Sequence, residues 1–270
     1  MTTVEFVTVD SGRVLPPSLA SLIGREVRRL VGHPVLWLLP AVVMVVTGAE
    51  AFDASRTAGY WYNAIFSTSA FFGPMIVLFA ANLIASSARR SGAEEMLSVT
   101  PTIDTRRTRA LCLGVALALG GFGAIGAGAM ALIGSGVNNI PPEELLTAGE
   151  LAQLPLVLAG AGLLGVLAAR WLPFPGGALV AFVAAVLGGI NLFSRFDAGI
   201  WWMWWTTGAT FEGRQPLLGE PWLHVVYLFG LCACATVAAV YRDRTQWPRL
   251  ALVGAPVLAA TLALGWLQLR

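Results

Sequence analysis

Few residues in this chain could carry out chemistry, and they are too scattered to form a known catalytic set. The two histidines, His33 and His224, are far apart in the sequence, and no H-E-x-x-H, G-x-S-x-G or Ser/His/Asp arrangement accompanies them. Cys112, Cys232 and Cys234 have no histidine or carboxylate nearby, so they are predicted to be apolar packing residues and not metal ligands. All seventeen basic residues are arginine, and a phosphate-binding loop requires a lysine. The sequence therefore predicts no catalytic residue, no metal site and no ATP site in this chain.

The apparent nucleotide motif has a simpler explanation. Residues 121–126 match G-x-G-x-x-G, but they lie in an apolar stretch with no strand before it. Their glycines favour close packing of helices, as do the pairs Gly123 with Ala127 and Ala161 with Gly165.

The elements that must position any functional residue are membrane-spanning helices. Of the 270 residues, 57% are apolar and 12% are charged, and this charged share is about half that of soluble proteins. Seven apolar blocks each approach the ~20 residues that cross hydrocarbon as a helix: 35–52, 62–85, 110–134, 151–169, 176–193, 222–241 and 250–268. The last block contains Gly254 and Pro256 and is expected to be a tilted or peripheral span. The predicted fold is an all-α, polytopic helical membrane protein with six to seven transmembrane helices.

The arginines predict the orientation of the chain, because basic residues concentrate on the cytoplasmic side of the spans. With the N-terminus inside, the cytoplasmic segments hold Arg13, Arg25, Arg28, Arg29, Arg89, Arg90, Arg106, Arg107, Arg109, Arg170, Arg242, Arg244 and Arg249. The opposite side holds Arg56, Arg195, Arg214 and Arg270. We therefore expect a cytoplasmic N-terminus and a C-terminus outside.

An amphipathic helix is predicted over residues 18–32, after a cytoplasmic lead at 1–17. Its apolar residues share one face, and the basic residues Arg25, Arg28 and Arg29 occupy the rest. We expect it to lie along the membrane surface with its basic face toward anionic headgroups, and to end at Gly32-His33-Pro34.

Glu26 interrupts this pattern, because its carboxylate falls within the apolar arc. We expect a guanidinium partner, either Arg29 one turn later or an arginine from another segment. The alternative is that Glu26 reaches the surface on its own.

A second short helix is predicted over residues 91–100, on the cytoplasmic side between the second and third spans. Ser91 and Glu94 match a capping box, and Pro101 ends the helix. We expect its apolar residues Met96, Leu97 and Val99 to be exposed and to contact a partner. The alternative is that the segment is a solvated connector between the two spans.

On the outer side, residues 194–221 are too long for a turn and too apolar for water, and we expect one or two re-entrant or interfacial helices there. The tryptophans of this stretch are typical of an interfacial anchor, with a ligand site as the alternative: Trp201, Trp202, Trp204 and Trp205. The interiors of the spans hold almost no ionisable residue, so the energy for any transport must come from elsewhere.

These features together resemble the permeases of type-2 ATP-binding-cassette exporters. The surface helix reads R-E-x-x-R and the loop after the second span reads R-x-G-x-x-E-x-L-x-x-T-P, through Arg25, Glu26 and Arg29, and through Arg90, Gly92, Glu95, Leu97, Thr100 and Pro101. The resemblance covers residues 18 to about 241. It implies that 18–32 is the connecting helix, that 35–241 is the transmembrane domain, and that 250–268 is an additional helix.

The resemblance also implies a mechanism and partners. The loop helix would be the coupling helix that docks in a separate ATPase subunit, through Gly92, Glu94, Glu95, Met96, Leu97, Thr100 and Pro101. The connecting helix would touch the same subunit, through Arg25, Glu26, Arg28 and Arg29. ATP and Mg²⁺ would be bound by that ATPase, and a second permease chain, identical or related, would complete a transporter in the bacterial cytoplasmic membrane. The second and fifth spans would line the translocation path, at Met75, Phe79, Asn82 and Asn191.

The expected function is therefore export of a hydrophobic or amphipathic substrate, driven by ATPase subunits on separate chains. The alternatives are a non-transporting membrane immunity or assembly factor that uses the same surfaces, and a secondary transporter. Neither the composition nor the resemblance identifies a substrate.

Overall fold

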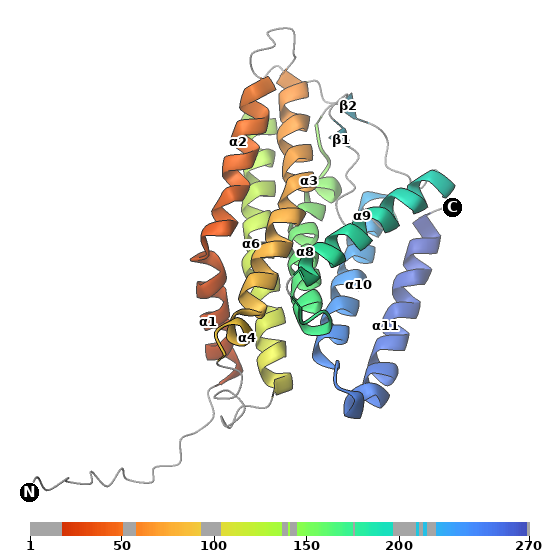
Figure 1. Ribbon diagram of the computed structural model, residues 1–270. Coiled ribbons are helices and arrows are strands. Elements are labelled where there is room, and N and C mark those ends of the chain that lie inside the picture. Colours follow the sequence, from red (N-terminus) through yellow and green to blue (C-terminus); the bar gives the residue numbers. More distant parts are fainter. Residues whose placement is uncertain are drawn as a thin grey trace, which may run out of the picture.

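The structure is a computed structural model that describes residues 18–50, 58–92, 104–136, 140, 145–174, 176–196, 209–210, 213–214 and 220–268. It is a bundle of helices with one short strand pair (Figure 1). The elements are α1 (Leu19–Val31), η1 (Pro34–Trp37), α2 (Leu38–Glu50), α3 (Ala58–Ala85), α4 (Ser87–Arg90), α6 (Asp104–Gly136), α7 (Ala148–Leu151), α8 (Gln153–Trp171), α9 (Gly177–Phe196), β1 (Ala209–Thr210), β2 (Gly213–Arg214), α10 (Pro221–Val240), η4 (Arg244–Gln246) and α11 (Trp247–Gln268).

The long apolar helices confirm that the chain is a multi-pass helical membrane protein. Within the described residues, five helices are long and apolar enough to cross a bilayer, and α1 with α2 makes a sixth if this pair, bent by 54°, is one span. The predicted fifth block corresponds to α9, which runs obliquely to its neighbours in Figure 1. The structure thus supports five or six spans where the sequence predicted six or seven.

The break between α1 and α2 lies where the sequence placed it. Helix α1 ends at Val31 with Gly32 as its C-cap, and η1 begins at Pro34. Proline has no backbone N–H to continue a helix, and the ring of His33 accepts a hydrogen bond from Val35 N at 3.4 Å. The His33 side chain therefore accepts a hydrogen bond from the Val35 N–H, which the bend would otherwise leave without a partner.

Helix α8 occupies the centre of the bundle, in contact with α3, α6 and α10. Small residues allow its neighbours to approach closely, as the sequence predicted for Gly123 and Gly165. A Cβ added to Gly165 would lie 2.2 Å from Leu78 O on α3, and one added to Gly123 would lie 2.6 Å from Pro155 Cα on α8. Backbone-to-backbone contact at these positions is possible only for glycine.

Helix α11 lies at the edge of the bundle, as expected for the last apolar block (Figure 1). It packs on α10, where Thr261 lies against Gly230, and its Gln268 side chain is 2.9 Å from His224 Nδ1. Most of its other apolar side chains are exposed, as in a helix that faces lipid on its remaining sides.

Four described residues of the outer segment form strands where the sequence predicted short helices, while 194–196 are the end of α9. Ala209–Thr210 and Gly213–Arg214 form an antiparallel strand pair and not part of a re-entrant helix. Glycine and β-branched threonine both disfavour helix, and threonine favours strands, which explains the difference at these residues. The four tryptophans of this segment lie outside the described residues.

Candidate functional site

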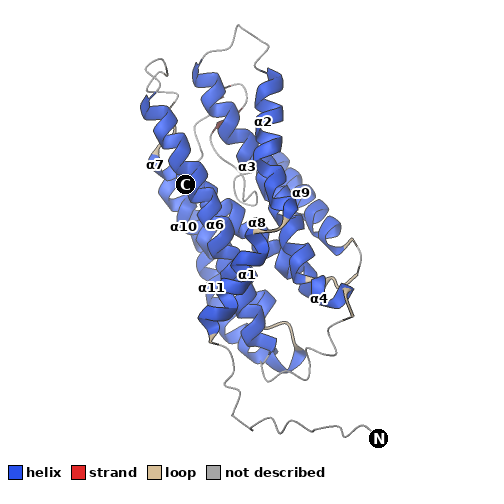
Figure 2. Cartoon of the chain, turned by 90° about the vertical axis from the view of Figure 1, so that its left-hand side faces the viewer, coloured by secondary structure: helices blue, strands red, loops and turns tan. Residues whose placement is uncertain are grey.

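One end of the bundle gathers most of the arginines. The lower end in Figure 1 is formed by α1, α4, the starts of α6 and α11, and the ends of α3, α8 and α10. Figure 2 shows the same arrangement from the side. We call this end the arginine end, and its described arginines are Arg25, Arg28, Arg29, Arg89, Arg90, Arg106, Arg107, Arg109, Arg170, Arg242 and Arg249. The sequence had assigned all of them to one side of the membrane.

Helix α1 is held at this end by packing and by an ion pair. The Cβ that would be added to Gly114 of α6 lies 2.9 Å from Glu26 Cβ, so α1 packs closely on α6. Arg29 Nη1 donates to both carboxylate oxygens of Glu26, at 2.9 and 3.1 Å. The predicted guanidinium partner of Glu26 is therefore confirmed as Arg29.

Arg29 also connects α1 to α4. Its Nη2 donates to Ser87 Oγ at 2.7 Å, so one guanidinium joins the carboxylate of α1 to the first residue of α4. The hydroxyl of Ser87 donates in turn to Ile84 O at 2.8 Å, in the last turn of α3. One side chain thus links α4 directly to α1.

Helix α4 is further fixed to the bundle by its two arginines. Arg89 Nη1 donates to Ala169 O near the end of α8 at 3.4 Å, and Arg90 donates to Leu83 O of α3. Carbonyls in the last turn of a helix lack intrahelical donors, so guanidinium groups are suitable partners there. The short helix α4 therefore bridges α1, α3 and α8.

The chain leaves α4 through a turn that only glycine adopts easily. Ser91 is the C-cap of α4, and Gly92 is exposed with φ +68°, in the left-handed region. Ser91 has φ −85° and ψ 0°, which differs from the extended backbone expected of the N-cap predicted there. The remaining residues predicted for the coupling helix, Glu94, Glu95, Met96, Leu97, Thr100 and Pro101, lie outside the described residues.

The chain resumes at Asp104, the first residue of α6, and is again tied to α8. The carboxylate of Asp104 pairs with the guanidinium of Arg170, with Nη1 3.3 Å from Oδ1. Arg242 donates to Arg170 O, which links α8 to the residues just after α10. A carboxylate in the first turn of α6 also suits the positive end of the helix dipole.

The end of α10 is fixed to α6 and α8 by aromatic residues. Arg109 Nη2 donates to the Tyr241 hydroxyl at 3.0 Å, and its guanidinium lies 5.8 Å from the centre of that ring. Trp171 Nε1 donates to Ala238 O at 3.0 Å. The described residues on both sides of segment 93–103 are therefore joined to one polar framework that includes α1, α8 and α10.

The residues predicted for a translocation path lie on α3 and α9, but they are not equivalent. The ring centres of Phe79 on α3 and Phe182 on α9 are 6.1 Å apart. Met75, one turn before Phe79 on α3, is 39% exposed. Asn82 Nδ2 instead donates to Gly165 O at 3.2 Å, so this amide holds α3 against α8. The side chain of Asn191 is not among those described.

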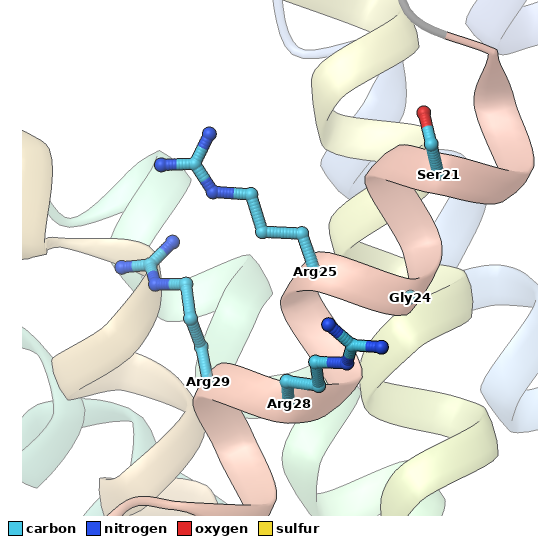
Figure 3. A pocket seen from close by; sticks show the side chains of 5 residues that line it. All are labelled: Ser21, Gly24, Arg25, Arg28 and Arg29. Carbon is cyan, nitrogen blue, oxygen red and sulfur yellow. The ribbon is translucent and has the colours of Figure 1, made fainter.

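The exposed face of α1 forms a hollow that sequence reasoning did not predict. It measures about 530 Å³ and is lined by Ser21, Gly24, Arg25, Arg28 and Arg29 (Figure 3). The basic face was visible in the sequence, but the sequence alone could not show that the space over Gly24 is left open.

Two other polar features were also missed. Thr147 and Glu150 form a capping box at the start of α7, with Glu150 Oε2 2.6 Å from Thr147 N, and the T-x-x-E pattern was a signal for it. The pairing of Asp104 with Arg170 spans 66 residues and left no local signal. Among the described residues, no three metal-ligating side chains come together.

Comparisons with family models, with curated proteins and with solved structures gave no match for this chain. The geometry of the site is therefore the basis of the functional argument.

Proposed function

We propose that this chain is the transmembrane subunit of an ATP-driven exporter whose ATPase is a separate chain. The observation that supports this most is the polar framework on both sides of segment 93–103. Arg29 and Arg89 tie the helix before it to α1 and α8, and Arg170 ties the helix after it to α8. A force applied to the segment would reach several spans together.

In this proposal the residues after Gly92, up to Thr100, form a coupling helix that docks on the ATPase, two residues shorter than the sequence predicted because Ser91 ends α4 and Gly92 is a turn. Leu97 and Met96 would enter an apolar cleft, and Glu94 and Glu95 would pair with basic residues of the partner. ATP binding would bring two ATPase subunits together and move the coupling segments of two permease chains. Thr100 and Pro101 would end the helix and pass the motion to Asp104 at the start of α6.

The role of α1 in this mechanism follows from its contacts. The Glu26 carboxylate and the Ser87 hydroxyl share the Arg29 guanidinium, so α1 would move with α4 as one unit. Because α1 also packs on α6 at Gly114, the unit would include the helices on both sides of the coupling segment.

The substrate would be hydrophobic or amphipathic, because the described spans offer mainly apolar side chains. Met75 and Phe79 on α3 and Phe182 on α9 would contact it. Asn82 is removed from this set, since its amide is bonded to Gly165 O.

The proposal is tested by co-purification of the chain from its native membrane, which should bring a phosphate-loop ATPase with it. The Glu95→Arg variant should lose the ATPase while still inserting into the membrane, because it reverses a charge at the proposed contact. Glu220→Arg is the matched control: Glu220 is exposed at the N-cap of α10, at the opposite end of the bundle, and this variant should keep the ATPase. Retention of the ATPase by Glu95→Arg would contradict the proposal.

A second measurement distinguishes transport from simple binding. In proteoliposomes the complex should hydrolyse ATP at a rate that an apolar or amphipathic substrate changes. If added substrate does not change the rate of ATP hydrolysis, and ATP does not change the distribution of substrate across the membrane, the chain is an assembly or immunity factor.

A further inference from the structure

The hollow on the exposed face of α1 has a glycine, Gly24, at its base and arginine side chains around its edge. A Cβ added to Gly24 would meet nothing within 4 Å, so the space above this residue is free. Three guanidinium groups stand around it, and Figure 3 shows Arg25 and Arg29 extending in the same direction from the helix. Ser21 lines the end of the hollow nearest the start of α1.

The charge around the hollow is not balanced by the described part of the protein. Glu26 is the one carboxylate on α1, and it is engaged by Arg29. Arg25 and Arg28 are exposed and have no hydrogen bond or ion pair with any described residue. Within the part of the chain that the structure describes, two guanidinium groups are therefore available to an anion.

The position of the hollow relative to the apolar surface indicates the kind of anion. Val31 at the end of α1, Trp37 at the end of η1 and Leu38 at the start of α2 are exposed by 43%, 56% and 52%. Trp37 Nε1 donates to Val31 O at 3.0 Å, which fixes the indole beside the end of α1. Exposed tryptophan is typical of the level where hydrocarbon meets headgroups, so the hollow lies at headgroup level.

We propose that this hollow binds the phosphate of one anionic phospholipid. Arg25 and Arg28 donate hydrogen bonds to the phosphate oxygens above Gly24, and the acyl chains lie along Val31, Trp37 and Leu38. Guanidinium groups suit this ligand because their planar donors match phosphate oxygens in pairs. The inference depends only on the chain spanning a membrane, and not on the transport function proposed above.

The opposite face of α1 explains why a lipid fits better here than a helix of a partner. Leu30 is buried and Glu26 faces α6, so the apolar side of α1 is already covered by protein. The exposed side offers arginines and an open glycine, with no apolar ridge that a partner helix could pack against.

The test is a titration of the purified full-length chain in neutral detergent with a fluorescent phosphatidylglycerol. We expect saturable binding of one lipid per chain, and no comparable binding of phosphatidylcholine. Replacing both Arg25 and Arg28 with Gln should weaken binding about 25-fold, since each arginine near an anionic surface contributes roughly a fivefold effect. Gly24→Leu should also weaken binding, because it fills the hollow without changing the charge.

The matched control is Arg249→Gln, which removes an exposed arginine from the start of α11 at the same end of the bundle. Its binding should equal that of the unmodified chain. An equal loss in Arg249→Gln would overturn the proposal, since it would show diffuse attraction to the whole arginine end.

Two further results would also overturn it. Displacement of the lipid by millimolar inorganic phosphate would mean that the hollow is a site for free anions. Unchanged lipid binding after replacement of both Arg25 and Arg28 with Gln would place the lipid elsewhere. Size-exclusion profiles and intrinsic tryptophan fluorescence of each variant establish that the fold is kept, and the two arginine substitutions provide a result independent of Gly24→Leu.

Discussion

Replacing Gly165 with alanine should separate the two most closely packed helices of the bundle. The added Cβ would lie 2.2 Å from Leu78 O and 3.2 Å from Ala81 Cβ. Carbon and oxygen atoms normally approach no closer than about 3.3 Å, so α3 must move away from α8 by about 1 Å. Because the close atom is a backbone oxygen, no side-chain rotation can relieve the contact.

The cost can be estimated from two contributions. Forcing an extra methyl group into a packed interface costs about 1–3 kcal/mol. The shift also lengthens the bond from Asn82 Nδ2 to Gly165 O, now 3.2 Å, and an interhelical hydrogen bond within a membrane contributes about 0.6 kcal/mol. Alanine favours helix over glycine by about 1 kcal/mol, which offsets part of this cost. We expect Gly165→Ala to reduce the free energy of unfolding by a net of about 1–3 kcal/mol, measured by SDS titration in mixed micelles.

Two other glycines serve as controls for this prediction. A Cβ on Gly128 would meet nothing within 4 Å, so Gly128→Ala should be neutral or slightly stabilising. A Cβ on Gly162 would lie 2.2 Å from Leu119 Cδ1, the end of a flexible side chain, so Gly162→Ala should cost less than Gly165→Ala. If Gly165→Ala unfolds at the same SDS fraction as Gly128→Ala, the reasoning about backbone contact is refuted.

Three further predictions concern polar groups. Arg29→Gln should lower the free energy of unfolding by about 1 kcal/mol, since the pair is partly exposed. Ser87→Ala should cost less in that background than in the unmodified chain when both are followed by SDS titration, because only its bond to Ile84 O is then left to lose. Asp104→Arg and Arg170→Asp should each destabilise the chain in thermal unfolding, and the double exchange should recover most of the loss; no recovery would argue against a direct pair. Gln153 is fully buried and neither polar atom of its amide has a hydrogen-bond partner among the described residues, so Gln153→Met should be neutral or stabilising by about 1 kcal/mol in the same assay.

The sequence was informative wherever the relevant contacts are local. The break at Gly32–Pro34 follows from the chemistry of glycine and proline, and the pairing of Glu26 with Arg29 follows from their spacing on one helix. The apolar blocks also located the helices to within a few residues, because the thickness of hydrocarbon fixes their length.

Contacts between distant parts of the chain could not be predicted in the same way. The bond from Asn82 to Gly165 joins residues 83 apart, and many carbonyls at this depth could have accepted it. The pairing of Asp104 with Arg170 depends on which helix ends meet at the arginine end. The strand pair of Ala209–Thr210 with Gly213–Arg214 was missed because the apolar composition of the outer segment suggested helices, while glycine and threonine both disfavour helix and threonine favours strands.

The central place of α8 has a consequence for biogenesis. Its neighbours are α3 and α6, which a ribosome makes earlier, and α10, which it makes later. Until α10 is made, the side of α8 that packs on α10 can be covered only by lipid or by an insertase. A chain truncated before Pro221 would therefore leave that side of α8 without its protein partner. Such truncated products should be short-lived in the cell, degraded by membrane quality control, whereas loss of the edge helix α11 should be tolerated far better.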